Sequence, residues 1–485
     1  MSSMFFILNI LGQSIEIDTD YGVNGLTEIL STSNTSVQPY SKQLNDGSLL
    51  VSTSRYLEAE DKHEEVIVKY KPDGSIDTSF ANNGVYVLDI DLENTSVLYD
   101  DNGIELFLDE SENIYLYLSP FKNAIVKLNS EGVLETSFGT NGYLITVDDQ
   151  YENSKNGRVI AYDEGIIVGL VKKDDPQIRI LKKYTSNGSI DNTFGNNGIL
   201  SVPYEGRMFK LNDGDFILSQ KYESGTLGFI KISPKGNIDN SFGNNGQVLF
   251  DKEGYLNYHE ASNNALYVSL TSFEEVNGET KIKTNIYKFD ANSGEKDMDF
   301  GTNSTVVIED VFVQESFTEL NDKLYIHGLN FKSFDTHIAS LNFDGTINSS
   351  FEDNGTYIEN LNTTKEFSIS IFPSENALII VGKTIQNGTN PTKHFSKKYK
   401  LSNATASIDE IEKQKIVFEN PIKDKIEVKS TISQINRLDI ISLNGRLIKS
   451  SKSNIIETKN LPSNIYILNS YLENGNIIRK KIIKK

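Results

Sequence analysis

The sequence predicts an all-β fold: a seven-bladed β-propeller of four-stranded blades, followed by a small antiparallel β-sandwich. Two observations lead to this prediction. A short motif, clearest as GSIDNTFGNNG at Gly188–Gly198, recurs along most of the chain. Between its copies, apolar and polar residues alternate with the period of two that is typical of strands, and no long helical period is present. Units of four short strands, repeated at roughly this spacing, are typical of propeller blades.

The motif is most easily followed by its aromatic residue. The aromatic residues are Tyr21, Phe80, Phe138, Phe194, Phe242, Phe300 and Phe351. An acidic residue lies three positions before most of them, as at Asp77, Asp191 and Asp239. A glycine lies four positions after most of them, as at Gly84, Gly142, Gly198 and Gly246. The copies around Phe300 and Phe351 depart most from the pattern.

Each position of the motif has a physical interpretation as scaffold. The first glycine, such as Gly188, supplies a turn with positive φ at the end of the fourth strand. The acidic residue accepts backbone N–H bonds and caps the loop. The aromatic ring fills the seam between adjacent blades, which stabilises the fold by roughly 1.5–3 kcal/mol per ring. The following Asn-Gly permits a tight turn into the next blade.

A second interpretation makes the Asp- and Asn-rich loop a Ca²⁺ site. Calcium takes six to eight oxygen ligands. Each copy offers too few regularly spaced carboxylates for such a shell, so the sequence favours the scaffold interpretation and predicts no metal site.

One unit shows the expected order of strands. An outgoing strand at Gly142–Val147 is followed by two strands around a tight turn, Gly157–Asp163 and Gly165–Val171. A fourth strand, Ile178–Tyr184, leads into the next motif. Turn-forming residues separate the four segments.

The ring is expected to close inside one motif. The last strand of the seventh unit reads KKYKLSNATASIDE at Lys397–Glu410, which resembles the run before Phe80 but lacks the aromatic residue. The missing half, IDTDYG, stands at Ile17–Gly22. The N-terminal half would then complete what the C-terminal half begins, which removes exposed sheet edges.

Four segments are expected along the chain. Residues 1–14 contain the apolar run Met4–Leu11 without a preceding Lys or Arg, so we expect an export signal whose start is truncated; a buried first strand is the alternative. Residues 15–402 form the propeller. Residues 403–413 are a polar linker, and residues 414–485 form the sandwich.

Charge divides the chain in two. Residues 409–485 carry 15 Lys+Arg against 9 Asp+Glu, whereas the whole chain carries 47 against 67. The remainder of the chain, residues 1–408, is therefore strongly acidic and should repel nucleic acid and anionic membranes. The chain has no cysteine, which excludes disulfides and thiolate ligands. No stretch is long and apolar enough for a transmembrane span.

The repeat resembles the delta-60 repeat, a β-propeller-like repeat of bacterial secreted proteins whose function is undefined. The resemblance rests on the spacing G-x-I-D-x-S-F-G-x-N-G and covers about Ile15–Ser402. It implies a secreted propeller and no particular activity.

The C-terminal segment has alternating strands with turns at Asn420-Pro421, Asn444-Gly445 and Asn474-Gly475. It resembles the type A C-terminal sorting domain of the type IX secretion system of Bacteroidetes. The matching residues are Asn420, Pro421, Gly445, Leu461, Pro462, Tyr466, Lys480, Lys481, Lys484 and Lys485. Asn464 stands where most such domains have glycine.

The resemblance to a sorting domain implies export and recognition by the outer-membrane translocon as partner. It also implies a secreted or cell-surface location, often with removal of the domain and attachment to surface lipopolysaccharide. Without the upstream matches, the terminal lysines would be interpreted as a solvated basic tail.

A search for chemistry finds no catalytic, cofactor-binding or metal residues to assign. His327 and His337 fall on neighbouring strands and could approach each other, but no metal-ligand spacing or catalytic motif is present. Acidic pairs such as Asp148-Asp149 lie at strand ends and read as solvated charges. Aromatic residues in loops could stack on sugars; these are Tyr40, Tyr56, Tyr204, Tyr222, Phe273 and Phe331, and none is assigned as a site.

Three functions remain open from the sequence. The favoured one is a non-enzymatic surface or secreted propeller that binds glycan or protein. A secreted glycoside hydrolase or lyase on the same scaffold is an alternative, which an acidic cluster at the central channel would support. A structural cell-envelope protein is the third.

Overall fold

The computed structural model describes residues 13–29, 38–57, 62–88, 104–118, 124–153, 159–175, 177–203, 206–221, 225–276, 278–313, 317–330, 335–352, 355–359, 365–385, 393–403, 416–418, 421–430, 434–442, 447–473 and 477–484. No helix occurs among them. The chain divides into a large unit, Gly12–Ser402, and a C-terminal unit that begins at Asn403. Each unit is described by itself.

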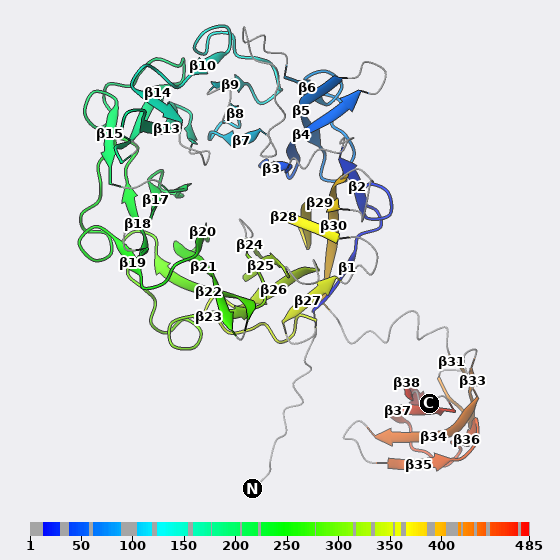
Figure 1. The fold of residues 1–485 in the computed structure, drawn as a ribbon. Coiled ribbons are helices and arrows are strands. Elements are labelled where there is room, and N and C mark those ends of the chain that lie inside the picture. The colour runs from blue at the N-terminus through cyan, green and yellow to red at the C-terminus, as the bar shows by residue number, and fades with distance from the viewer. Residues whose placement is uncertain are drawn as a thin grey trace. The chain divides into compact units, whose positions relative to one another are not determined.

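The large unit is a ring of seven antiparallel sheets, as the sequence predicted (Figure 1). Blade 1 consists of β3 (Tyr40–Gln43), β4 (Leu49–Leu57), β5 (Lys62–Tyr70) and β6 (Val85–Val87). Blade 2 consists of β7 (Glu105–Leu108), β8 (Ile114–Leu118), β9 (Ala124–Leu128) and β10 (Tyr143–Ile145). Blade 3 consists of β11 (Tyr151–Asn153), β12 (Val159–Tyr162), β13 (Gly165–Lys172), β14 (Arg179–Thr185) and β15 (Ile199–Val202).

Blades 4 to 6 have four strands each. They are β16 (Met208–Lys210), β17 (Phe216–Lys221), β18 (Leu227–Ile232) and β19 (Val248–Phe250); β20 (Tyr255–Glu260), β21 (Ala265–Val276), β22 (Glu279–Asp290) and β23 (Val306–Glu309); and β24 (Phe317–Leu320), β25 (Lys323–Leu329), β26 (Thr336–Leu341) and β27 (Thr356–Glu359). Where Figure 1 labels both strands, the first strand of a blade (β3, β7, β20, β24) lies toward the centre of the ring and the fourth (β6, β10, β23, β27) toward its edge.

Blade 7 is built from both ends of the propeller sequence. It contains β28 (Lys365–Ser374), β29 (Ala377–Ile385), β30 (Lys393–Asn403), and the N-terminal strands β1 (Gln13–Ile17) and β2 (Leu26–Ile29). Both N-terminal strands pair with β30, and Leu26 lies opposite Lys397. The ring is therefore closed by strand pairing between its termini, which covers the edge that β30 would otherwise expose.

The middle strands of the blades are packed on both faces. β8 (IYLYL) and β9 (AIVKL) are buried along their whole length, because a neighbouring blade covers each side. Their near-continuous apolar sequence follows from this double burial, as in other sheets covered on both faces. Separate apolar clusters fill the seams between neighbouring blades, such as the one formed by Tyr115, Phe138, Ile166 and Ile180.

The sequence prediction was wrong about where the motif lies within a blade. Tyr143–Ile145 pairs with β9, so the strand that follows a motif belongs to the same blade as the strand before it. The motif therefore connects the third strand to the fourth instead of joining one blade to the next. Alternation alone did not reveal this, because it does not show which strands pair.

The expected leader at residues 1–14 overlaps the propeller by two residues, because β1 begins at Gln13. The carbonyl of Gln13 accepts a 2.9 Å hydrogen bond from the N–H of Glu352. Six bonds of the same kind cross the other seams, from the residue after each aromatic to a carbonyl of the next blade, such as Gly139 N to Asn187 O at 2.9 Å. Gln13 thus takes part in a set of hydrogen bonds that repeats at every seam of the ring.

The C-terminal unit is a small antiparallel β structure around one core. Its main sheet has the order β35 (Leu447–Ser451), β34 (Ile435–Ser442), β37 (Asn464–Leu472) and β38 (Ile477–Lys484). Two short ladders join β31 (Ile416–Val417) to β33 (Lys429–Ser430) and β32 (Lys425–Glu427) to β36 (Ile455–Glu457). Leu438, Ile440, Leu468 and Ile482 are buried between these sheets.

Candidate functional site

The aromatic residues of the motif fill the seams of the ring. All seven side chains are at most 1% exposed. Phe80 belongs to the cluster of the next blade, with Leu106 and Leu116, and Phe194 packs with Phe216 and Ile230 of its next blade. Tyr21 takes the same place at the closing seam, with Val51 and Val66. These residues hold blades together and are not available to a ligand.

The acidic residues of the motif cap the turn that contains the aromatic. Asp191 Oδ1 accepts the N–H of Thr193 at 3.0 Å and its hydroxyl at 2.6 Å, and Asp77 and Asp239 do the same with Ser79 and Ser241. The serine bonds hold the pKa values of Asp77 and Asp239 below the usual range. These carboxylates are ionised acceptors within the scaffold.

The glycines of the motif are required by close approach. Gly188 has φ 83°, and a Cβ there would lie 2.7 Å from the amide nitrogen of Gly139 in the preceding motif. Gly84, Gly142, Gly198 and Gly246 all have positive φ and follow an asparagine that also has positive φ. At Gly198 a Cβ would meet Ile190 at 2.4 Å. Both reasons favour glycine.

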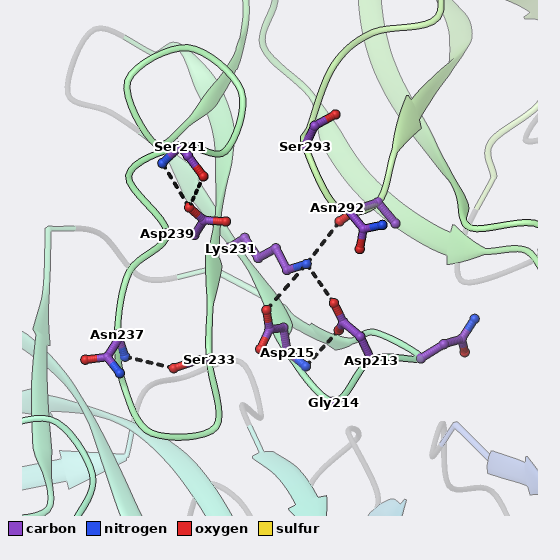
Figure 2. Close-up of polar contacts among 12 residues, drawn as sticks. Asp213, Gly214, Asp215, Lys231, Ser233, Asn237, Asp239, Ser241, Asn292 and Ser293 are labelled. Carbon is purple, nitrogen blue, oxygen red and sulfur yellow. Dashed lines mark hydrogen bonds and ion pairs between the residues drawn. The ribbon is translucent and has the colours of Figure 1, made fainter.

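The face of the ring that carries the turns of the motif is called the motif face. One acidic cluster on this face surrounds a buried lysine. The Nζ of Lys231 lies 2.8 Å from Asp213 and 3.4 Å from Asp215, and donates to the carbonyl of Ala291 at 3.3 Å (Figure 2). Burial alone would lower the pKa of Lys231, but the bonds and charges of the two carboxylates outweigh it and raise that pKa. Burial and the charge of Asp213 raise the pKa of Asp215. The cluster is a compensated ion group between blades 4 and 5.

Five other acidic side chains of this face bind neighbouring blades. Each accepts a backbone N–H from the hairpin of the adjacent blade that joins its first and second strands. The bonds run from Asn45 to Glu112 (2.6 Å), Ser111 to Asp163 (2.8 Å), Asp163 to Glu110 (2.8 Å), Asn212 to Glu260 (2.5 Å) and Ser262 to Glu319 (2.8 Å). These carboxylates thus have a structural role.

The two histidines that the sequence placed on neighbouring strands do not form a site. His327 lies opposite Ile338, and His337 lies opposite Gly328, so the two imidazoles point to opposite faces of blade 6. His327 is 1% exposed, and neither ring nitrogen has a hydrogen-bond partner among the described residues. Burial lowers the pKa of His327 to about 3. Within the described ranges, no group of three or more His, Asp or Glu side chains could hold a metal ion.

One feature breaks the sevenfold pattern: a cluster of three aromatic rings over the seam between blades 5 and 6. Tyr255 (59% exposed) and Phe273 (46%) are the two exposed aromatic side chains of the part of the chain that the structure describes. Their ring centroids lie 6.0 Å apart, and that of the half-buried Phe312 lies 5.9 Å from Tyr255 and 6.0 Å from Phe273. We call Tyr255, Phe273 and Phe312 the aromatic platform.

The three rings of the platform are inclined to one another at different angles. Phe273 and Phe312 are inclined to each other by 36°, whereas Tyr255 stands at 86° to Phe273 and 72° to Phe312. The two phenyl rings are therefore closer to parallel, and the tyrosine ring stands nearly perpendicular to both. Exposed flat rings beside a polar group form a surface to which the apolar face of a pyranose can bind.

The local sequence explains why the platform forms in this blade. β21 and β22 have 12 residues each and form the longest hairpin of the propeller among the described strands, so Phe273 extends beyond the buried part of the sheet. Gly254 has φ 154°, and a Cβ there would lie 2.2 Å from the carbonyl oxygen of Thr271. The glycine lets the chain approach β21 and places Tyr255 directly opposite Thr271.

Hydrogen bonds anchor the segment that carries Phe312. Thr284 donates to the carbonyl of Val311 at 2.8 Å, and Asn257 donates to that of Val313 at 2.9 Å. Phe312 lies between Val311 and Val313 in the chain, and its own N–H donates to Leu329 O at 2.9 Å. The segment that carries Phe312 is therefore held in place, which reduces the entropy that a ligand must overcome there.

The platform lies on the opposite face of the ring from the motifs. Phe273 is near the turn between the second and third strands of blade 5, whereas the motif joins the third and fourth strands. Antiparallel strands place these two connections at opposite ends of the sheet. The regular face thus carries the scaffold, and the variable face carries the candidate site.

Sequence reasoning found one of the three platform residues. Phe273 was among the aromatic residues considered for sugar stacking, whereas Tyr255 and Phe312 were not. Of the others, Tyr40 is half-buried on β3, the Tyr56 side chain is not described, and Tyr204, Tyr222 and Phe331 lie outside the described residues. The signal for Tyr255 was a glycine followed by an aromatic at the start of a strand.

All ten predicted sorting residues belong to the C-terminal unit, and seven of them are described. The N–H of Leu461 donates to Thr458 O at 3.0 Å, the hydroxyl of Tyr466 donates to Pro462 O at 3.0 Å, and Lys484 Nζ donates to Lys423 O at 2.6 Å. Lys480 and Lys481 are on β38, and Pro421 precedes the bridge between Ile422 and Lys484. Asn420, Gly445 and Lys485 lie outside the described residues.

Comparisons with known proteins agree with the fold. A family described as a domain of unknown function, DUF5122, beta-propeller, matches residues 44–80. No curated protein sequence matches the chain. The described residues contain no helix that could cross a membrane.

Solved structures similar to this chain have low sequence identity. The polysaccharide lyase Uly1 is 10% identical, with 79% of this chain and 93% of that chain covered and a TM-score of 0.46. A protein of unknown function from Dyadobacter fermentans DSM 18053 is 10% identical, with 80% and 99% covered and a TM-score of 0.39. The WD40 domain of SCAP from fission yeast is 9% identical, with 81% and 91% covered and a TM-score of 0.35.

Proposed function

We propose that this protein is a non-enzymatic propeller that binds glycan through the aromatic platform. The observation that supports this most is the placement of Tyr255 and Phe273. Among the described aromatic side chains only these two are exposed, and they lie in contact with each other. Exposed apolar rings that are scattered singly need no explanation, whereas a contiguous group is typical of an interaction site.

The chemistry of the platform favours a sugar over an enzymatic substrate. Ring faces bind the C–H groups of a pyranose, and the phenolic hydroxyl of Tyr255 can donate or accept one hydrogen bond. The acidic side chains that could support a hydrolase, such as Glu110 and Asp213, contact neighbouring blades or Lys231 on the other face. Glycan binding therefore needs no residues other than those of the aromatic platform.

A glycan array with the full chain tests this function. The wild-type protein should bind at least one class of glycan, and the double variant Tyr255→Ala/Phe273→Ala should bind it at least tenfold more weakly, or ~1.4 kcal/mol. The matched control is Leu249→Ala/Met298→Ala, which removes exposed apolar side chains elsewhere on the propeller. Equal loss in both double variants, or no binding by the wild type, would rule the function out.

We also propose that the repeat is of the delta-60 type and that the C-terminal unit is a type IX sorting domain, which delivers the propeller to the cell surface or medium. The support is the sequence resemblance, together with a C-terminal unit that has its own core and follows the propeller after Ser402. Deletion of Lys413–Lys485 in a Bacteroidetes host should leave the propeller folded in the periplasm. Arrival of the truncated chain at the surface would contradict this.

A further inference from the structure

We infer that the aromatic platform takes neutral glycans, and that Glu275 determines this specificity by accepting sugar hydroxyls and repelling anionic sugars. The inference rests on the proposed function and adds the class of ligand. Its first support is position. Phe273 and Glu275 are two residues apart on β21, so their side chains lie on the same face of the hairpin.

A hydrogen bond fixes the Glu275 carboxylate. Thr280 is the cross-strand partner of Glu275, and its hydroxyl donates to Glu275 Oε1 at 2.5 Å. Both residues are exposed beyond the ring of Phe273. A carboxylate held beside ring faces can accept hydroxyl groups of a sugar that lies on those faces, and bonds to charged acceptors are the stronger ones.

The charge around the platform supports a neutral ligand. In residues 251–255, 272–283 and 309–312, seven exposed carboxylates accompany three lysines. Lys281 and Lys283 lie opposite Glu274 and Glu309, which alternation places on the other face of the hairpin from Phe273. The face of the platform therefore has Glu275 without a neighbouring lysine on the hairpin. A uronate or sulfated chain would meet like charge there, within a Debye length of about 10 Å at 0.1 M salt.

Titration of the full chain with defined hexasaccharides tests the inference. The neutral probes are cellohexaose, laminarihexaose and chitohexaose, and the anionic probes are hexamers of polygalacturonate and alginate. The wild type should bind a neutral hexamer at least tenfold more tightly than either anionic one. Glu275→Gln should weaken the neutral complex about fivefold to tenfold, because the amide oxygen is a weaker acceptor, and should strengthen binding of the anionic hexamers.

The matched control is Glu295→Gln, which removes an exposed carboxylate of the same blade on the motif face. It should bind every hexamer as the wild type does. Tighter binding of an anionic hexamer by the wild type would overturn the neutral specificity and leave the proposed function standing. Unchanged binding by Glu275→Gln would overturn the role of Glu275. If no hexamer of either kind bound, both the inference and the proposed function would fail.

Discussion

The N–H of Asp18 donates a 2.8 Å hydrogen bond to the carbonyl of Lys398, at the two ends of the propeller sequence. The same bond, also 2.8 Å, joins Asp77 to Lys69 within blade 1. The return bond from Lys398 N to Gly25 O likewise repeats the one from Lys69 to Gly84. The split motif therefore has the geometry of an intact one, and the ring closes as if the chain were continuous there.

Closure by the N-terminal strands predicts that residues 13–29 are needed for a stable ring. A chain that begins at residue 30 lacks the strands that pair with β30, so its unfolding midpoint should fall by on the order of 10 °C. A chain that begins at Gln13 is the control and should melt with the full-length protein. Differential scanning calorimetry measures both, and equal midpoints for the two truncations would contradict the closure.

The aromatic residues of the motif are predicted to be major sources of stability. Phe194→Ala leaves a cavity between blades 3 and 4 and should lower the free energy of unfolding by about 3–5 kcal/mol. Ile190→Ala, at an exposed position of the same motif, should cost less than ~1 kcal/mol. Urea unfolding gives both values. Similar costs at the two positions would show that the Phe194 side chain does not join the blades.

Two glycines separate backbone conformation from close approach. Gly188 and Gly214 have similar φ angles of 83° and 89°, but a Cβ at Gly214 would meet nothing within 4 Å. Gly214→Ala should therefore cost only the left-handed penalty of about 1–2 kcal/mol. Gly188→Ala should cost about 1–3 kcal/mol more, because Gly139 must move. Equal free energies of unfolding for the two variants would refute the contact between motifs.

His327 predicts a loss of stability in acid. An unfolded imidazole titrates near pH 6.5, whereas burial lowers the pKa of folded His327 to about 3. Between these values the unfolded state binds more protons, so stability falls as the pH drops from 6.5. By pH 4.5 the loss from this residue should be about 3 kcal/mol.

The variant His327→Leu should remove that part of the pH dependence. It replaces a buried group whose nitrogens have no partner among the described residues by an apolar one of similar size, so it should not destabilise the protein at pH 7. Urea unfolding at pH 7 and pH 4.5 compares the variant with the wild type. The same drop in both proteins would show that another group causes it. In that case His259, whose pKa burial also lowers, to about 4, is the next candidate.

The repetition of the sequence predicted the number of blades, because each copy of the motif repeats the same packing problem. Positions such as Phe138 and Asp191 could be interpreted from one copy and checked in the others. The assignment of strands to blades could not, since a strand such as Tyr143–Ile145 alternates equally well whichever neighbour it pairs with. Pairing is a long-range property that the local pattern does not contain.

The candidate site was harder to predict for the opposite reason. Tyr255, Phe273 and Phe312 come from three separate segments and occur once, so no repetition marks them. Their exposure depends on the extra length of one hairpin and on the approach of Gly254 to Thr271. The sequence predicted only that a localised function should lie where the copies differ, and the contacts come from the structure.

Hydrogen–deuterium exchange with a bound neutral hexasaccharide tests the platform most directly. The ligand should protect amides in residues 254–257, 271–283 and 310–313, and leave the motif at Gly188–Gly198 unchanged. Protection should vanish in Phe273→Ala and persist in Leu249→Ala. Protection confined to the motif face, or the same protection in Phe273→Ala as in the wild type, would contradict the assignment of the aromatic platform as the binding site.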